Sequence, residues 1–273
     1  ALGSAGGAFK EGDRVWVASR LACGQCEFCW TGRDNLCAHG HFFGMGLPGG
    51  YAQYVKVPVV SLRALHPQMG FEQAAASQIA FGKDWHVLIN RGGLQAGQTV
   101  LIQAAGSGIG SAAVQVAKYA GATVLATAGS DSKLARAKDL GADHLINYTE
   151  HPHFSEQVLA LTQGKGVDLV MEHIGGEVFT QSLSSLKTDG KIVTVGAHAG
   201  EVVALDIIPF FRRQLQLIGS RNANFAELNL VMDLVAQGRF KPVIHAALPL
   251  AQAAQAHRIM GARDVFGKVV LLP

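Results

Sequence analysis

Four cysteines lie together near the start of the chain and could do metal chemistry. They are the only cysteines among the 273 residues, at Cys23, Cys26, Cys29 and Cys37. Thiolates at these spacings can surround one tetrahedral Zn²⁺ ion and leave no open position for water. Disulfides are the poorer alternative, because neighbouring Cys-x2-Cys pairs close small, strained rings. The spacing therefore predicts one structural zinc in a reducing compartment.

Two histidines follow this cysteine segment closely. His39 and His41 are near enough in the sequence to replace a thiolate. Four cysteines already complete a tetrahedral site, so we expect both histidines in a loop.

A glycine-rich turn in the middle of the chain is a second candidate site. The apolar run 100–105 leads into Gly106, Ser107, Gly108, Ile109 and Gly110, and apolar residues then recur at helical spacing until Gly121. Glycines keep such a turn tight and let backbone N–H groups approach a pyrophosphate at the positive end of the following helix. The match to the three-glycine fingerprint is imperfect, and an ordinary tight loop is the alternative. The flanking strand and helix favour a dinucleotide.

The residues after the next apolar run, 124–126, bear on the choice of cofactor. Enzymes that prefer NAD usually place a carboxylate there, which accepts hydrogen bonds from the ribose hydroxyls. This chain has Ala128 instead, followed by Ser130 and Lys133, a hydroxyl and a cation able to bind the 2′-phosphate of NADPH. The alternative for Lys133 is a solvated lysine, slightly unfavourable against the helix dipole. The pattern favours NADPH.

A parallel sheet must hold these motifs. Residues 99–148 read as one strand-helix-strand-helix-strand unit. The alternation continues with helix 154–161, strand 167–171, helix 179–186, strand 191–195, a helical segment 209–213 and strand 215–219. Short loops and right-handed crossovers predict a doubly wound, Rossmann-type α/β sheet.

The segments on either side of this unit are richer in strands. Before it we expect a strand at 14–18, a turn and strand at 49–57, and one or two helices over 71–90; after it, a helix from 225 to 237, a strand at 242–247, a helix at 250–260 and a strand at 268–272.

Composition narrows the class of protein. Hydrophobic residues make up 49% of the chain, charged residues 16%, and the formal net charge is +3. This describes a compact globular protein with no charge pattern for nucleic acid or an anionic membrane. No apolar stretch reaches the length of a membrane span, and the start lacks the regions of a signal peptide. We expect a cytoplasmic protein that acts on small molecules.

Several motifs occur in one order along the chain: GDRV at 12–15, the four-cysteine segment, GYAQY at 50–54, the turn at 105–110, LGAD at 140–143 and FGKVV at 266–270. Together they resemble the medium-chain dehydrogenase/reductase superfamily, in particular its zinc-type alcohol dehydrogenase-like members that shade into quinone oxidoreductases. The resemblance covers nearly the whole chain from Phe9. It implies a partial GroES-like catalytic domain at 1–80 with the zinc lobe, a Rossmann domain at 81–222, and a return to the catalytic domain at 223–273.

The resemblance also implies site residues. In NADPH-using relatives a lysine and a third-strand tyrosine, here Lys133 and Tyr148, surround the phosphate and the adenine. The backbone of Val195, Gly196 and Ala197 would face the nicotinamide carboxamide. Relatives normally carry several dozen residues ahead of 12–15, with two catalytic zinc ligands, so this part of the catalytic domain is expected to be absent. The third ligand position holds Ile79, whose alkyl group cannot bind zinc.

We therefore expect an NADPH-dependent oxidoreductase that transfers hydride between the nicotinamide and a small carbonyl, quinone or conjugated alkene. The alternatives are an NAD-linked zinc alcohol dehydrogenase and a nucleotide-binding protein that has lost catalysis. The catalytic residues stay unassigned. Lys83 is either a proton donor or half of a surface salt bridge with Asp84, and His173 either lines the cofactor cleft or packs.

One segment also indicates how copies of the chain associate. Residues 214–220 are apolar at alternate positions, and an exposed strand edge of this kind invites pairing. In relatives the matching strand pairs across a two-fold axis, so we expect a homodimer.

Overall fold

The computed structural model describes residue 3 and residues 7–273, and the chain forms two compact units. The sheet unit is Lys83–Arg221. The lobe unit combines Ala1–Gly82 with Asn222–Pro273. The chain passes from one unit to the other inside helix α2 (Phe71–Trp85) and returns shortly before α8 (Phe225–Ala236).

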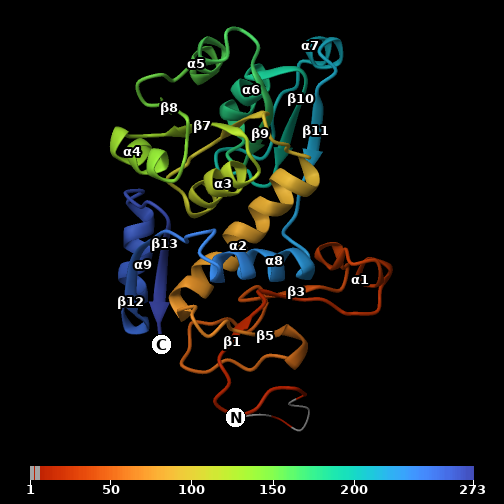
Figure 1. The fold of residues 1–273 in the computed structure, drawn as a ribbon, viewed down its shortest axis with the longest axis vertical. Helices are drawn as coiled ribbons and strands as arrows, with labels where there is room; N and C mark the ends of the chain where they lie inside the picture. Colours follow the sequence, from red (N-terminus) through yellow and green to blue (C-terminus); the bar gives the residue numbers. More distant parts are fainter. Residues whose placement is uncertain (1–2, 4–6) are drawn as a thin grey trace. The chain divides into compact units, whose positions relative to one another are not determined.

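Residues 83–221, all of them described, build a six-stranded parallel sheet in the order β11-β10-β9-β6-β7-β8 (Figure 1). The strands are β6 (Thr99–Ile102), β7 (Thr123–Ala128), β8 (His144–Asn147), β9 (Val167–Glu172), β10 (Leu186–Thr194) and β11 (Gln216–Gly219). Leu101 of β6 lies opposite Leu125 of β7 and Val170 of β9. The order reverses between β6 and β9, which confirms the doubly wound α/β fold.

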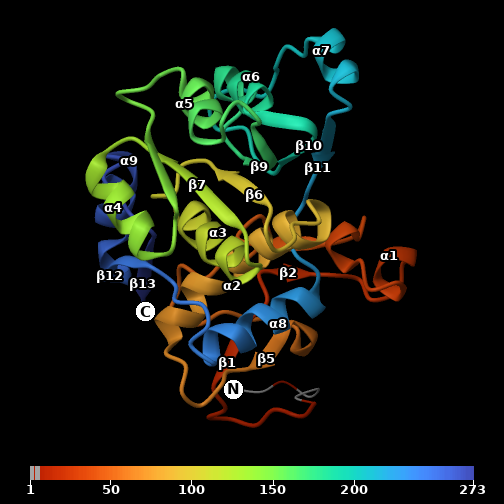
Figure 2. The same ribbon diagram turned by 45° about the horizontal axis from the view of Figure 1, so that its top comes forward.

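Helices cover both faces of this sheet (Figures 1 and 2). α3 (Gly108–Tyr119) and α4 (Asp131–Asp139) pack on one face, and α5 (Phe154–Leu161) and α6 (Gly176–Ser184) on the other. Under α5 and α6 lies an apolar core with members from the sheet and the helices, including Leu101, Leu125, Phe154, Val158, Phe179 and Ile192. Burial of this apolar surface contributes about 25 cal/mol per Å² to the stability of the sheet unit. The packed core thereby keeps the strands, and the residues at their ends, in place.

The lobe unit is made of smaller sheets. β1 (Val15–Val17) pairs with β5 (Leu62–Ala64), β2 (Arg20–Leu21) pairs with β3 (His41–Phe43) and β3 with β4 (Gly46–Leu47), and β12 (Ile244–Pro249) pairs in parallel with β13 (Lys268–Leu272). The remaining elements are α1 (Glu27–Trp30), α9 (Ala253–Gly261) and the short turns η1 (Asp34–Leu36), η2 (Val59–Ser61) and η4 (Leu250–Gln252).

The strand expected within 49–57 is wrong. Residues 51–57 have an extended or bent backbone that belongs to no strand, and Tyr54 is 91% exposed. A strand is defined by its hydrogen-bonded neighbour, and none of the described strands pairs with this segment. Instead, residues 54–59 line one side of a groove of about 950 Å³, with Val15 and Val17 of β1 on its wall.

Other expected elements differ only in their bounds. α6 starts three residues before Phe179, because Gly175 and Gly176 adopt positive φ and begin the helix. β10 starts at Leu186, which pairs with Val167 before the register shifts at Lys191. The expected helical stretch after Phe71 divides into α2 and a π-helical turn, η3 (His86–Arg91). Among the described residues, no helix is both long and apolar enough to cross a membrane.

Candidate functional site

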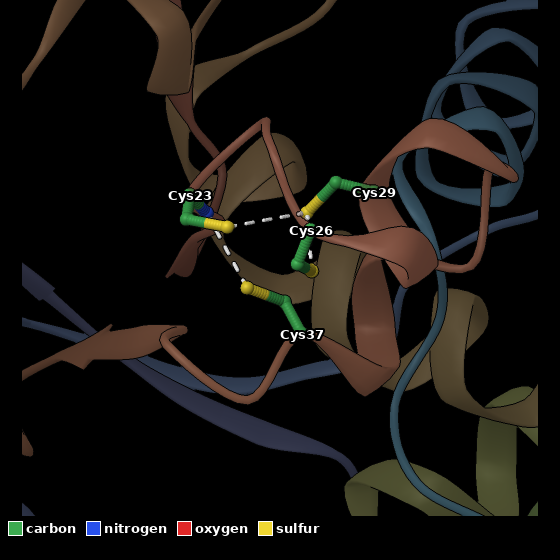
Figure 3. A group of neighbouring side chains, drawn as sticks. All are labelled: Cys23, Cys26, Cys29 and Cys37. Carbon is green, nitrogen blue, oxygen red and sulfur yellow. Dashed lines mark hydrogen bonds between the residues drawn. The ribbon is translucent and has the colours of Figure 1, made fainter.

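The four cysteines converge on one point in the lobe unit (Figure 3). Their ligand atoms all lie within 4.8 Å of one another. The Sγ atoms of Cys26 and Cys29 are 3.5 Å apart, and those of Cys23 and Cys29 are 3.9 Å apart. A disulfide needs about 2.05 Å, whereas thiolates at about 2.3 Å from a tetrahedral Zn²⁺ stand about 3.8 Å apart. The donor set therefore fits a zinc ion and not a pair of disulfides.

Burial and the neighbouring thiols shift the pKa values of two of these cysteines. The pKa of Cys29 is raised to about 12, first by burial and then by the neighbouring Cys26 thiol. Burial also raises the pKa of Cys37, but hydrogen bonds from the backbone and thiol of Cys23 outweigh it, and the net shift is downward. Four thiolates this close repel one another unless a divalent ion neutralises part of the charge.

Arg20 supports the cysteine lobe, and sequence reasoning missed it. Its buried guanidinium donates to the carbonyl oxygens of Asp34 and Cys37, the latter at 2.8 Å. A guanidinium that donates to two carbonyls fixes the loop that carries Cys37. The one available signal was an arginine three residues before Cys23, the first cysteine of the cluster.

Asp34 attaches this lobe to the C-terminal part of the same unit. Its carboxylate accepts from the backbone N–H of Phe225 at 3.1 and 3.2 Å, at the start of α8. Burial raises the pKa of Asp34, although the Phe225 hydrogen bond opposes the shift. His39 and His41 lie outside the group of described residues that could share a metal with the cysteines. His39 lies in a turn, but the loop expected for His41 is wrong, because His41 begins β3 and pairs with Leu21.

The glycine-rich turn joins β6 to α3 in the sheet unit. Ala104 has a φ of +46°, a strained value for a residue with a Cβ, and marks the sharp exit from the strand. Ser107 caps α3: its Oγ accepts from the N–H of Gly110 at 2.9 Å. A Cβ on Gly110 would lie 2.3 Å from the Ala104 carbonyl oxygen, so only glycine fits. The twelve-residue helix α3 thus presents its N-terminal N–H groups at a turn in which glycines hold three of the five positions 106–110.

Three polar residues gather where β7 ends. Ala128 is 2% exposed and brings no carboxylate to this point. Ser130 caps α4 by accepting from the N–H of Lys133 at 3.4 Å. Tyr148 lies over the turn, since a Cβ on Gly129 would be 2.8 Å from its Oη. The structure therefore brings Ser130, Lys133 and Tyr148 to the same strand end.

The residues after β9 and β10 lie at the same carboxyl edge of the sheet as the end of β7. Val195 donates to the Glu172 carbonyl at 2.9 Å, and Ala199 donates to the Ile174 carbonyl at 2.6 Å, so the two loops are hydrogen-bonded together. A Cβ on Gly196 would lie 2.9 Å from the His173 carbonyl oxygen. Val195, Gly196 and Ala197 therefore follow directly alongside His173.

A buried chain of hydrogen bonds connects the strand ends, and it was not anticipated from the sequence. Thr127 donates to Gln103, Gln103 donates to Ser182, and Ser182 donates to the Glu172 carboxylate, at 2.8, 3.1 and 2.6 Å. The other Glu172 oxygen accepts from the N–H groups of Ile174 and Gly175 at 2.5 and 2.9 Å. Satisfied buried networks of this kind specify one geometry.

Of the two alternatives for Lys83, a proton donor or half of a surface salt bridge with Asp84, the surface salt bridge is wrong. Asp84 is completely buried, and neither carboxylate oxygen has a hydrogen-bond partner among the described residues. Burial raises the pKa of Asp84 well above its ordinary value, against a weaker opposing effect of Lys83. The side chain lies on the buried side of α2, which adjacency in the sequence does not reveal.

The fold and these sites together define a zinc-binding, nucleotide-dependent dehydrogenase class. Residues 108–237 match the zinc-binding dehydrogenase family, and residues 1–67 match the alcohol dehydrogenase GroES-like domain. The chain belongs to the medium-chain dehydrogenase/reductase superfamily, as a zinc-type alcohol dehydrogenase-like member, and is an oxidoreductase.

Three similar proteins illustrate the range of this family. An NAD-dependent alcohol dehydrogenase of Sulfolobus acidocaldarius is 29% identical over 96% of this chain and 76% of its own length. The crystal structure of an NAD-dependent alcohol dehydrogenase is 42% identical with a TM-score of 0.93, covering 98% of this chain and 78% of that one. A 2-octenoyl-CoA carboxylase reductase, solved with NADP and 2-octenoyl-CoA, is 28% identical with a TM-score of 0.88, covering 96% and 63%.

Proposed function

We propose that this oxidoreductase uses NADPH to transfer hydride to a small carbonyl compound, a quinone or a conjugated alkene. The observation that carries the proposal is the set of residues at the end of β7. Ala128 supplies no carboxylate to bind the NAD ribose or to repel a phosphate, while Ser130 and Lys133 begin helix α4 and Tyr148 packs over Gly129 at the same strand end. A hydroxyl and a cation are suited to a 2′-phosphate.

In this proposal the rest of the cofactor follows the carboxyl edge of the sheet. The N–H groups of Gly108 and Ile109, at the start of α3, bind the pyrophosphate beside Gly106 and Ser107, while Gly110, whose N–H donates to Ser107, keeps the turn close to the strand. The backbone of Val195, Gly196 and Ala197 binds the nicotinamide end. The bound cofactor supplies the hydride, and the protein's task is to hold the ring at a fixed orientation.

The cysteine lobe holds one structural zinc in this proposal. Cys23, Cys26, Cys29 and Cys37 would be its ligands, because their sulfur atoms stand at the spacing that a tetrahedral ion requires. Four protein ligands leave no position for substrate, so this zinc orders the lobe and takes no part in hydride transfer.

The NAD-linked zinc alcohol dehydrogenase is the second candidate, and the names of two similar proteins favour it. Against it stand Ala128 at the ribose position and Ile79, which has no atom that can bind a catalytic zinc. A binding protein without turnover is the third candidate. The NADP-bound reductase among the similar structures supports the first.

The test is a titration of NADPH and NADH into the parent protein and a Lys133→Ala variant. One charge-assisted hydrogen bond contributes about 1.5 to 3 kcal/mol, so the variant should bind NADPH about ten- to a hundredfold more weakly. NADH lacks the phosphate and should bind almost unchanged. Lys138→Ala, exposed on the same helix α4, is the matched control and should change neither affinity.

This titration also separates the candidates. A parent that binds NADH more tightly than NADPH, or equal losses for both cofactors in Lys133→Ala, would contradict the assignment of the phosphate site. Turnover of a panel of carbonyls, quinones and conjugated alkenes by the parent distinguishes an enzyme from a binding protein.

A further inference from the structure

His173 stands at the point of the sheet where a dinucleotide would cross. It is the first residue after β9, and the strand order reverses between β6 and β9. Dinucleotides bind across such a reversal, with the pyrophosphate at the helix that follows the first strand, here α3. The adenosine half then lies on the β7 side, so the nicotinamide half lies toward β9 and β10. His173 is on this second side.

The backbone around His173 is held on both flanks. Val195 donates to the carbonyl of Glu172, and Ala199 donates to the carbonyl of Ile174. Behind it, the Glu172 carboxylate accepts from the N–H groups of Ile174 and Gly175. The imidazole therefore projects from a segment with little freedom to move.

The ring itself has no hydrogen-bond partner in the part of the chain that the structure describes. His173 is 3% exposed, and both Nδ1 and Nε2 are buried and unpartnered. Burial, followed by the nearby charges of His198 and Lys83, lowers the pKa of His173 to about 4. At neutral pH the uncharged ring therefore offers one N–H donor and one nitrogen acceptor. Such groups are seldom left unpaired in a native protein, which points to a missing ligand.

We propose that His173 binds the nicotinamide half of the cofactor by exchanging hydrogen bonds with an uncharged group that both donates and accepts. The carboxamide and the ribose hydroxyls of that half share this chemistry. Glu172 acts as a positioning residue, because its carboxylate fixes the two peptide groups that follow the histidine. The inference rests on the proposed function, since it requires that a nicotinamide dinucleotide binds at this edge.

The experiment compares three probes by calorimetric titration into the full chain. NADPH carries the whole nicotinamide half, 2′-phospho-ADP-ribose lacks only the nicotinamide ring, and adenosine 2′,5′-bisphosphate lacks the whole half. The variants are His173→Leu, which removes both hydrogen-bonding atoms, and His173→Asn, whose amide keeps a donor and an acceptor. His144→Leu, at the start of β8 and therefore at the opposite edge of the sheet, is the matched control.

In His173→Leu, NADPH should bind about tenfold more weakly, as expected for one or two lost hydrogen bonds, while adenosine 2′,5′-bisphosphate binds as in the parent. That unchanged affinity also shows that the variant is folded. His173→Asn should recover part of the loss. If 2′-phospho-ADP-ribose weakens with NADPH, the partner is the ribose; if it does not, the partner is the carboxamide.

Equal weakening of all three probes in His173→Leu, or no weakening of NADPH, would overturn the role of His173 and leave the proposed function intact. A parent that binds none of the three probes, nor their counterparts without the 2′-phosphate, would overturn the proposed function and this inference with it.

Discussion

At the scale of single residues, the chemistry of the lobe depends on four sulfur atoms and one arginine. The four ligand atoms lie within 4.8 Å of one another, and burial together with the Cys26 thiol raises the pKa of Cys29, so a divalent ion would offset the cost of forming its thiolate. Arg20 holds the carbonyls of Asp34 and Cys37 and so fixes the loop of the last ligand. Metal affinity and folding of this lobe should therefore be linked.

Replacing one ligand tests this link. Cys26→Ser should reduce the zinc content of chelator-washed protein from about one ion per chain toward zero and lower the melting temperature, because a hydroxyl is a much weaker zinc ligand than a thiolate. Elemental analysis and thermal unfolding measure the two effects. His41→Ala removes a nearby ring from outside the cluster and should change neither. Disulfides found by mass spectrometry, or unchanged zinc in Cys26→Ser, would refute the site.

At the scale of elements, the turn between β6 and α3 is shaped by contacts that leave no room for a side chain. The Cβ introduced by Gly110→Ala would meet backbone atoms of Ala104 and Ala105 at 2.3 and 2.7 Å, and these cannot move without shifting the strand end. We expect a loss of about 1 to 3 kcal/mol in the free energy of unfolding, measured by urea titration. Gly261→Ala, with nothing within 4 Å of the added atom, should stay within about 0.5 kcal/mol of the parent.

Helix α2 carries Asp84, a buried carboxyl that has no hydrogen-bond partner among the described residues. Because burial raises the pKa of Asp84 above that of the unfolded chain, the folded state binds its proton more tightly. The resulting stability is present at acid pH and is lost as pH rises above the ordinary aspartate pKa of about 3.9 toward the raised one.

An uncharged replacement should therefore stabilise the protein more at higher pH. Asp84→Asn should melt above the parent, by an amount that grows from pH 4 upward and corresponds to about 1 to 3 kcal/mol at most. Thermal unfolding across pH 4 to 8 measures it. Asp139→Asn, exposed on α4, should follow the parent at every pH. Parallel curves for Asp84→Asn and the parent would show that the carboxyl finds a partner.

At the scale of the whole molecule, the sheet ends in a strand whose outer edge is unpaired among the described residues. β11 is the last strand in the order, and Leu217 is 44% exposed on it. α7 (Ile207–Arg212) adds exposed Ile207, Ile208 and Phe211, whereas Leu215 belongs to the core. An open apolar edge of this kind favours pairing with a second copy.

We predict that sedimentation at micromolar concentration shows a homodimer. Leu217→Glu should shift the protein toward the monomer, because the interface would have to bury a charge. His144→Glu places the same charge on β8, at the opposite edge of the sheet, and should leave the dimer intact. A parent that sediments as a stable monomer would contradict this assignment.

The alternation of strands and helices in 99–219, the glycine turn and the spacing of the four cysteines could be predicted from the sequence alone. These features depend on local patterns, because hydrophobic periodicity, glycine positions and the spacing of metal ligands can each be recognised within a short stretch of sequence. Only two helix or strand starts in the sheet, those of α6 and β10, moved by more than a residue or two, because glycine pairs and register shifts leave no periodic signal.

The remaining features could not be predicted in this way, since each depends on contacts between residues far apart in the chain. Residues 51–57 alternate like a strand but have no described neighbour to pair with. The sequence allowed Asp84 to be a surface ion-pair partner of Lys83, but in the folded protein its side chain is completely buried. The hydrogen-bond network that links Thr127, Gln103, Ser182 and Glu172 forms because three parallel strands end at the same edge of the sheet. At that edge the ring of His173 is buried and has no hydrogen-bond partner among the described residues. A sequence pattern records which residues are adjacent in the chain, but burial and hydrogen bonding depend on which are adjacent in space.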